Sequence, residues 1–128
     1  MPINFRNLAL LTALLFFGLA VTWMFAPAFL LSSWGVDFSG SAGLVGRRGA
    51  ALYAGIGVMF FLARRAGPSS TRSSLVTGFV SACLILAVLG LFEFVKGHAS
   101  SGILSAVAIE VLLSVAFIYV SRFSKSDS

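Results

Sequence analysis

Residues 8–26 read LALLTALLFFGLAVTWMFA, and the polar side chains in this run are confined to Thr12, Thr22 and the indole of Trp23. As a helix rising about 1.5 Å per residue, the run extends roughly 28 Å, which matches the hydrocarbon thickness of a bilayer. It is longer than the apolar core of a signal peptide, so we expect it to be retained as a membrane-spanning helix. Pro27 follows and predicts the end of that helix, because proline lacks a backbone donor.

Three further apolar runs follow along the chain. Residues 75–95 and 102–120 are as long as the first run, whereas residues 49–63 form a shorter one, GAALYAGIGVMFFLA. A full crossing by this short run requires the helix to begin near residue 44. The predicted spans are residues 8–26, 44–63, 75–95 and 102–121. With short connections between them, they predict a single all-α domain over residues 1–128, an integral membrane antiparallel four-helix bundle.

Composition supports a lipid-facing surface. Hydrophobic residues make up 59% of the chain and charged residues 10%, with a mean hydropathy of +1.02. Soluble domains carry about 25% charged residues. The net charge of +5 comes from basic residues at the ends of the apolar runs, where they meet anionic head groups. We therefore expect the lipid bilayer as a partner, and no nucleic acid. The single cysteine, Cys83, excludes an internal disulfide and a multi-cysteine metal site and is interpreted as a packing residue.

The distribution of positive charge predicts the orientation. An even number of spans leaves both termini on one side, together with the loop at residues 64–74. That side holds six of the nine basic residues: Arg6, Arg64, Arg65, Arg72, Arg122 and Lys125. The positive-inside rule then makes it the cytoplasmic side.

The connector after Pro27 is too apolar for a water-exposed loop. Its sequence, PAFLLSSWGVDFSGSAGL, predicts a short segment lying in the membrane interface, with Trp34 at head-group depth. Trp23, on the other side of the turn, is expected to join Trp34 in an aromatic belt. Tyr53 is interpreted as a belt or packing residue.

The second span is rich in small residues. Ala50–Ala54 and Ala51–Gly55 are small-xxx-small pairs, which let helix backbones approach closely in lipid. We expect this span to be the central packing helix.

Glu110 lies near the middle of the fourth span, so it is the strongest candidate for a functional residue. Ala106, Ser114 and Ser121 share its helical stripe, and this stripe is expected to face the interior. Glu110 must be protonated or paired with a cation. Arg47 and Arg48 enter the same half of the membrane but lie about 100° apart on their helix.

Arg48 is favoured as the partner of Glu110 because it shares a face with Ala51 and Gly55. Two interpretations of such a pair stay open. It is a structural clamp that fixes helix register, or it handles a proton or a ligand.

A second group of ionisable residues is expected on the external side. It comprises Asp37, Arg47, Arg48, Glu93, Lys96 and His98. The group either converges on one mouth or consists of solvated helix ends. The hypothetical binding site therefore includes Glu93 and His98 beside Glu110, Arg47, Arg48 and Ser114. No spacing of histidine, aspartate and glutamate predicts a metal site, no motif predicts catalytic residues, and no cofactor is expected.

Part of the chain resembles a known family. Pro27, Trp34-Gly35, residues 47–50 (RRGA), residues 53–57 (YAGIG) and Ala63-Arg64 resemble the small bacterial four-helix membrane proteins of the DoxX-like group. The resemblance covers the first two spans and implies a four-helix bundle in the bacterial inner membrane. Some relatives act as membrane partners of redox enzymes or in sulfur metabolism. That activity is not expected here, because the chain lacks the cysteine pair that a thiol–quinone exchange uses.

Three functions remain open from the sequence. The first is a non-enzymatic accessory subunit or binding protein that docks against another membrane protein or itself. The second is a small carrier or channel, acting as a homo-oligomer with Glu110 and one arginine on its path. The third is a protein that binds or processes a lipophilic molecule, such as a quinone or a lipid.

Overall fold

The computed structural model describes residues 4–123, which form five α-helices and no strand within that range. The helices are α1 (Phe5–Phe25), α2 (Pro27–Ser33), α3 (Gly40–Ala63), α4 (Ser70–Val95) and α5 (Ile103–Phe123). By length and composition α1, α4 and α5 are able to cross a membrane. The prediction of an all-helical chain with long apolar helices is therefore confirmed. Lys125 lies outside the described residues.

Helix α3 differs from the three apolar helices. It is 24 residues long, but Arg47, Arg48 and several glycines lie in it, and it does not reach the hydropathy of the other three. Its length alone, about 36 Å, matches a membrane crossing.

Side-chain caps fix where three helices begin. Asn4 accepts from the backbone N–H of Asn7 at 2.8 Å ahead of α1. Ser39 and Ser69 do the same for α3 and α4, with distances of 3.0 and 3.1 Å. Each cap satisfies a backbone donor that would otherwise be left without a partner in the first turn. Pro27 begins α2 and, as predicted, α1 ends before it.

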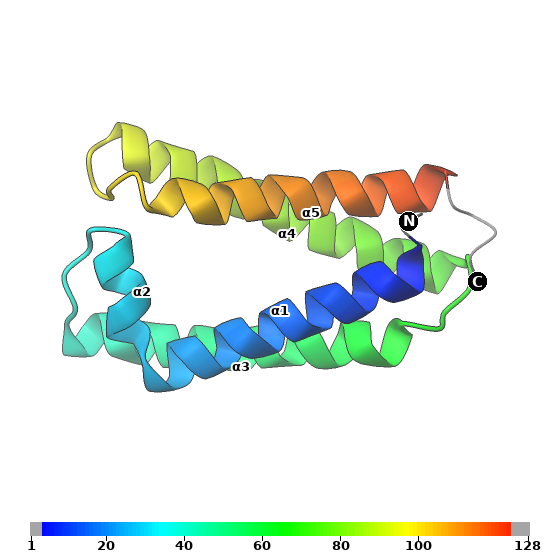
Figure 1. Cartoon of the computed structure of the whole chain (residues 1–128), viewed down its shortest axis with the longest axis horizontal. Coiled ribbons are helices and arrows are strands. Elements are labelled where there is room, and N and C mark those ends of the chain that lie inside the picture. The colour runs from blue at the N-terminus through cyan, green and yellow to red at the C-terminus, as the bar shows by residue number, and fades with distance from the viewer. Residues whose placement is uncertain (1–3, 124–128) are drawn as a thin grey trace.

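The long helices form two pairs (Figure 1). Helix α1 packs along α3, and α4 packs along α5. The pairs meet near the end that carries both termini and separate toward the other end, where α2 lies across the opening.

The face of α3 that packs against α1 is built from small residues. A Cβ at Gly46 would lie 2.8 Å from Trp23, and one at Gly57 would lie 2.8 Å from Phe17. Ala50 is buried on the same side. Of the two small-xxx-small pairs in the sequence, Ala50–Ala54 includes the buried Ala50, whereas Ala51 and Gly55 are both exposed, so the α1–α3 contact uses the side of the first pair.

Where the two pairs meet, aromatic rings fill the space between them. This phenylalanine cluster consists of Phe5, Phe16, Phe60, Phe79 and Phe117, with at least one ring from each of the four long helices. The Phe60 ring lies 4.8 Å from Phe79 and 5.1 Å from Phe117, between centroids. The Phe60 and Phe79 rings pack edge to face, whereas Phe60 and Phe117 are tilted by 40°, and edge-to-face packing adds to the energy of burial. The cluster is therefore the main junction between the two pairs.

Candidate binding site between the helix pairs

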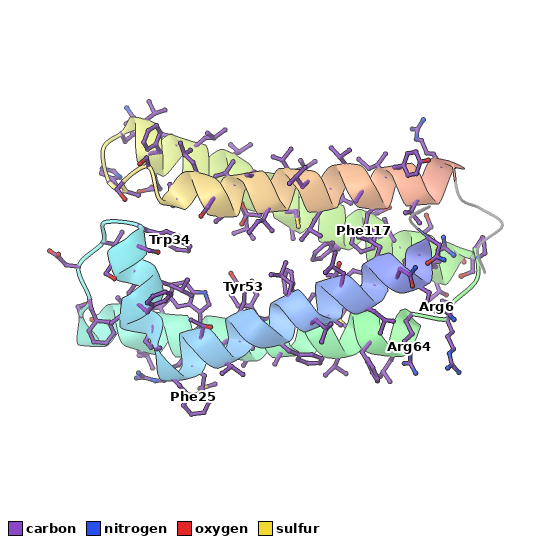
Figure 2. The ribbon with its side chains drawn as sticks, viewed as in Figure 1. Arg6, Phe25, Trp34, Tyr53, Arg64 and Phe117 are labelled. Carbon is purple, nitrogen blue, oxygen red and sulfur yellow. The ribbon has the colours of Figure 1, made fainter. Side chains whose placement is uncertain are left out.

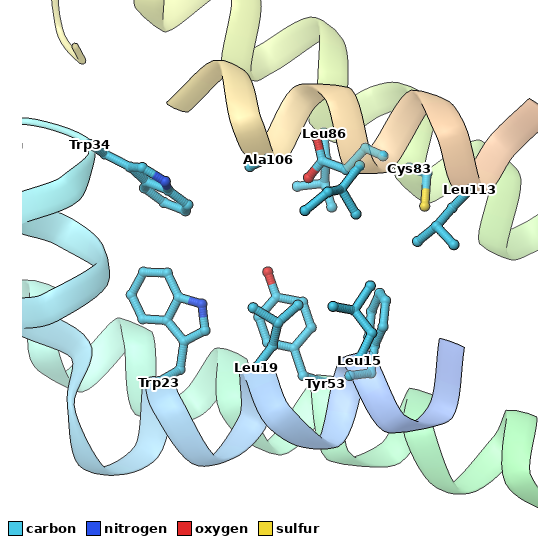
Figure 3. Close-up of a pocket in the computed structure, with 12 residues that line it drawn as sticks. Leu15, Leu19, Trp23, Trp34, Tyr53, Cys83, Leu86, Ala106 and Leu113 are labelled. Atoms are coloured by element: carbon cyan, nitrogen blue, oxygen red, sulfur yellow. The ribbon is translucent and has the colours of Figure 1, made fainter. Parts of the chain in front are cut away.

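Beyond the phenylalanine cluster, the separation of the two pairs leaves a cavity of about 90 Å³ (Figure 3). It is called the interhelical cavity below. Its lining residues are mostly apolar and aromatic: Leu15, Phe16, Leu19, Trp23, Trp34, Tyr53, Cys83, Leu86, Ala106, Ile109, Glu110 and Leu113. A cavity of this size is smaller than the roughly 150 Å³ that holds a benzene ring, so it accommodates a short length of hydrocarbon chain or part of a larger molecule.

Two tryptophans form the wall nearest α2. The rings of Trp23 and Trp34 lie 5.6 Å apart between centroids, because α2 turns the chain back over the end of α1. Trp23 is buried and Trp34 is half-buried. The sequence predicts these residues in an aromatic belt, whereas the structure brings them together as cavity lining. The backbone N–H of Ser100 donates to the Trp34 carbonyl at 2.7 Å, which joins this wall to the turn before α5.

Polar groups reach the cavity from both pairs. Tyr53 stands edge-on against Phe16, with a centroid separation of 5.4 Å, and its hydroxyl points away from α3 toward the α4–α5 pair (Figure 3). Glu110 is half-buried on α5 and is close enough to Tyr53 and Cys83 to interact with both electrostatically. An apolar cavity with a few converging polar groups is the usual form of a small-molecule site.

The interior stripe on α5 agrees with its helical spacing. Ala106 and Glu110 line the cavity, and Ser114 is buried one turn further. The Ser114 hydroxyl donates to the Glu110 backbone carbonyl at 2.9 Å, and its side chain is also within hydrogen-bonding reach of the Cys83 thiol on α4. Ser114 is therefore engaged by the backbone of α5 and by α4, and Glu110 is the acid that lines the cavity.

The structure does not bring Arg47 or Arg48 to Glu110. Both arginines are exposed on α3, and no ion pair joins either one to Glu110 among the described residues. The reason lies in the register of α3. Arg48 is two positions, or about 200°, from both Gly46 and Ala50, which face α1.

Glu93 and His98 are brought together at the turn between α4 and α5. Glu93 Oε2 lies 2.8 Å from His98 Nδ1, and both side chains are exposed. The Lys96 ammonium lies 5.7 Å from the Phe92 ring centroid. Asp37 is also exposed, and within residues 4–123 no ion pair or hydrogen bond joins it or the arginines of α3 to this pair. The predicted six-residue mouth is therefore reduced here to one Glu–His pair.

Several lining residues were interpreted from sequence as packing or belt residues only. Tyr53 lies three residues after the buried Ala50 and seven before the buried Phe60, so helical spacing alone points it toward the interior. Cys83 is likewise buried on α4. Residues 4–123 hold no group of three or more histidine, cysteine, aspartate and glutamate side chains able to bind a metal.

Comparisons with protein-family models, with curated proteins and with solved structures found no match.

Proposed function

We propose that this chain is a non-enzymatic membrane protein that binds a lipophilic molecule in the interhelical cavity. One observation carries the proposal: Glu110 and Tyr53 both line a cavity whose other walls are mostly apolar and aromatic, and the Tyr53 hydroxyl points into it (Figure 3). A purely apolar ligand would leave the Glu110 carboxyl without a hydrogen-bond partner, and a small ion would meet mainly hydrocarbon walls. The ligand class that satisfies both is an apolar body with a hydrogen-bonding head, such as a quinone or a lipid.

In this proposal all four long helices cross the membrane, with α2 in the interface. The support is the length of α3 and its packing along α1.

Both termini would be cytoplasmic, since Arg6 and Arg64 lie at the termini-bearing end (Figure 2). A bacterial inner-membrane location and DoxX-like membership rest on the sequence resemblance. Reporter fusions after residue 37 and after residue 66, which flank α3, should give opposite sidedness, and equal sidedness would contradict four spans.

The direct test is mass spectrometry of lipophilic molecules that copurify with the full chain in polymer-bounded native membrane discs. The native protein should enrich one species above its level in the bulk membrane. Glu110→Leu and Tyr53→Phe should each reduce that enrichment about tenfold, the effect of losing one hydrogen bond to a buried polar group.

Two further variants separate binding from folding. Ala106→Leu adds apolar volume to the cavity and should abolish enrichment without removing a polar group. Glu93→Gln changes the exposed acid at the other end of the α4–α5 turn and should leave enrichment unchanged. If every variant carries the composition of the surrounding membrane, or if Ala106→Leu retains the ligand, the cavity is not the site.

A second function is supported by the outer face of α3. Arg48, Ala51 and Gly55 recur there at helical spacing and are all exposed, and a Cβ at Gly55 would meet nothing within 4 Å. Such a face allows close approach of another membrane helix, as an accessory subunit requires. Gly55→Leu should then abolish crosslinking to a partner or a second copy, whereas Phe61→Ala, at an exposed position about 120° around the same helix, should not.

A further inference from the structure

A groove runs along the outer surface of the α4–α5 pair, apart from the interhelical cavity. Its volume is about 410 Å³. The lining residues come from the first half of α4 and the end of α5: Ser73, Val76, Thr77, Val80, Ser81, Ile118, Ser121 and Arg122. A recess of about 250 Å³ shares Ser73 and Ser121 with the groove and adds Pro68, Ser69 and Arg72.

The polar part of this surface lies at the end of the helices. Ser69 caps α4, and Arg122 lies in the last turn of α5. Two guanidinium groups, Arg72 and Arg122, therefore line adjoining hollows whose shared rim carries the hydroxyls of Ser73 and Ser121. For helices that span a bilayer, this end lies at head-group depth.

Arg72 is held in place before any ligand arrives. Its side chain is 5% exposed, it donates to the Ala66 carbonyl at 3.1 Å, and its guanidinium carbon lies 4.1 Å from the centroid of the Phe5 ring. A fixed guanidinium loses little rotamer entropy when it contacts an anion. Arg122, by contrast, is exposed and free to adjust to the ligand's position.

Toward the membrane centre the groove becomes apolar. Val76, Val80 and Ile118 line it there, with Thr77 one helical turn below Ser73. The Ser81 hydroxyl is occupied within the helix, because it donates to the Thr77 carbonyl at 2.8 Å. The order from the helix end inward is thus cations, hydroxyls and hydrocarbon. A phospholipid presents its phosphate, glycerol esters and acyl chain in the same order.

We propose that this groove is a binding site for one anionic phospholipid. The phosphate ester contacts Arg122, Arg72 and the serine hydroxyls, and Thr77 lies level with the glycerol esters. One acyl chain follows the groove past Val80 and Ile118. The site differs from a diffuse basic surface, because Arg65 at the same end is exposed but lines neither hollow.

Lipid titration of the delipidated full chain in mild detergent, followed by native mass spectrometry, tests this site. The probes are phosphatidylglycerol, phosphatidylcholine and inorganic phosphate. Phosphatidylglycerol should bind about tenfold more tightly than phosphatidylcholine, and inorganic phosphate at millimolar concentration should not displace it. Arg122→Gln should remove most of that preference. Thr77→Phe should weaken both lipids by filling the groove.

Two matched controls accompany these variants. Arg65→Gln removes the same charge from the same end, and Val88→Phe adds a ring to an exposed part of α4 outside the groove. Neither should change lipid affinity. The proposal is overturned if Arg65→Gln lowers the preference as much as Arg122→Gln, since the attraction would then be diffuse. It is also overturned if inorganic phosphate displaces the lipid, or if Thr77→Phe binds lipid normally.

Discussion

The two helix pairs are joined differently at the two ends of the molecule. At the termini-bearing end the phenylalanine cluster fills the space, and Phe60 and Phe117 are fully buried within it. At the α2 end the same helices stay apart, and the interhelical cavity contains the acid Glu110. The closed end therefore holds the two pairs together, and the open end leaves space for the ligand proposed above. The following substitutions test this division.

The largest effect is expected at the centre of the phenylalanine cluster. Phe60→Ala should lower the free energy of unfolding by about 3 kcal/mol, the low end of the range for buried phenylalanine, because the reference environment of the ring is lipid rather than water. Unfolding in mixed detergent, followed by circular dichroism, measures it. Phe25→Ala is the control, since Phe25 is 81% exposed and points outward (Figure 2). Equal losses in the two variants would mean that the cluster is not the junction.

The seam between α1 and α3 should show the next largest effect. Gly57→Ala places a methyl 2.8 Å from the Phe17 ring, so we expect a loss of about 2 kcal/mol. Gly55→Ala, on the open face, should be neutral or stabilising, because alanine favours the helix. Gly46→Ala should lose less than Gly57→Ala, since Trp23 has the cavity to move into. Equal losses at Gly46 and Gly57 would contradict the difference between the ends.

Replacing Thr12 should raise the free energy of unfolding, whereas the preceding substitutions lower it. It is fully buried, and its hydroxyl has no hydrogen-bond partner among the described residues. Thr12→Val keeps the shape and removes that group, so unfolding should become harder by about 1 kcal/mol. Thr22→Val is the matched control, because the Thr22 hydroxyl already donates to the Gly18 carbonyl at 2.8 Å. If Thr12→Val instead lowers the free energy of unfolding, the Thr12 hydroxyl makes a hydrogen bond when the protein is in the membrane.

The smallest change in stability is expected where α2 meets the start of α5. A Cβ at Gly102 would collide with the Ser33 carbonyl, so Gly102→Ala should push these segments apart. The loss should stay below about 1 kcal/mol, while hydrogen exchange at the Ser100 amide should accelerate. Gly40→Ala, which meets nothing within 4 Å, serves as the control. Unchanged exchange in Gly102→Ala would show that this end is not held by the contact.

The sequence predicted the helices more successfully than their contacts. Long apolar runs located α1, α4 and α5 within a few residues, because membrane thickness sets their length. The spacing of Ala106, Glu110 and Ser114 also predicted an interior stripe. The sequence does not choose between the small-residue faces of α3, since glycines and alanines lie on several sides of that helix. The structure uses the side that carries Gly46 and Gly57.

No pattern in the sequence predicts the interhelical cavity. It exists because a ring cluster joins the pairs at one end while α2 turns Trp34 back onto Trp23 at the other. Both the ring cluster and the contact between the two tryptophans depend on residues far apart in the sequence, so no local sequence pattern predicts them. The partner predicted for Glu110 failed for the same reason, because the register of α3 directs Arg48 outward.

The hydrogen bond from the Ser100 amide to the Trp34 carbonyl has a consequence for how the open end tolerates change. Both of its atoms belong to the main chain, so exchanging either side chain leaves it in place. Alanine at position 34 or 100 would keep this hydrogen bond, whereas proline at position 100 would delete the donor. The link between α2 and the turn before α5 therefore depends on the course of the backbone rather than on side chains. A distant sequence with the same backbone course would keep this link.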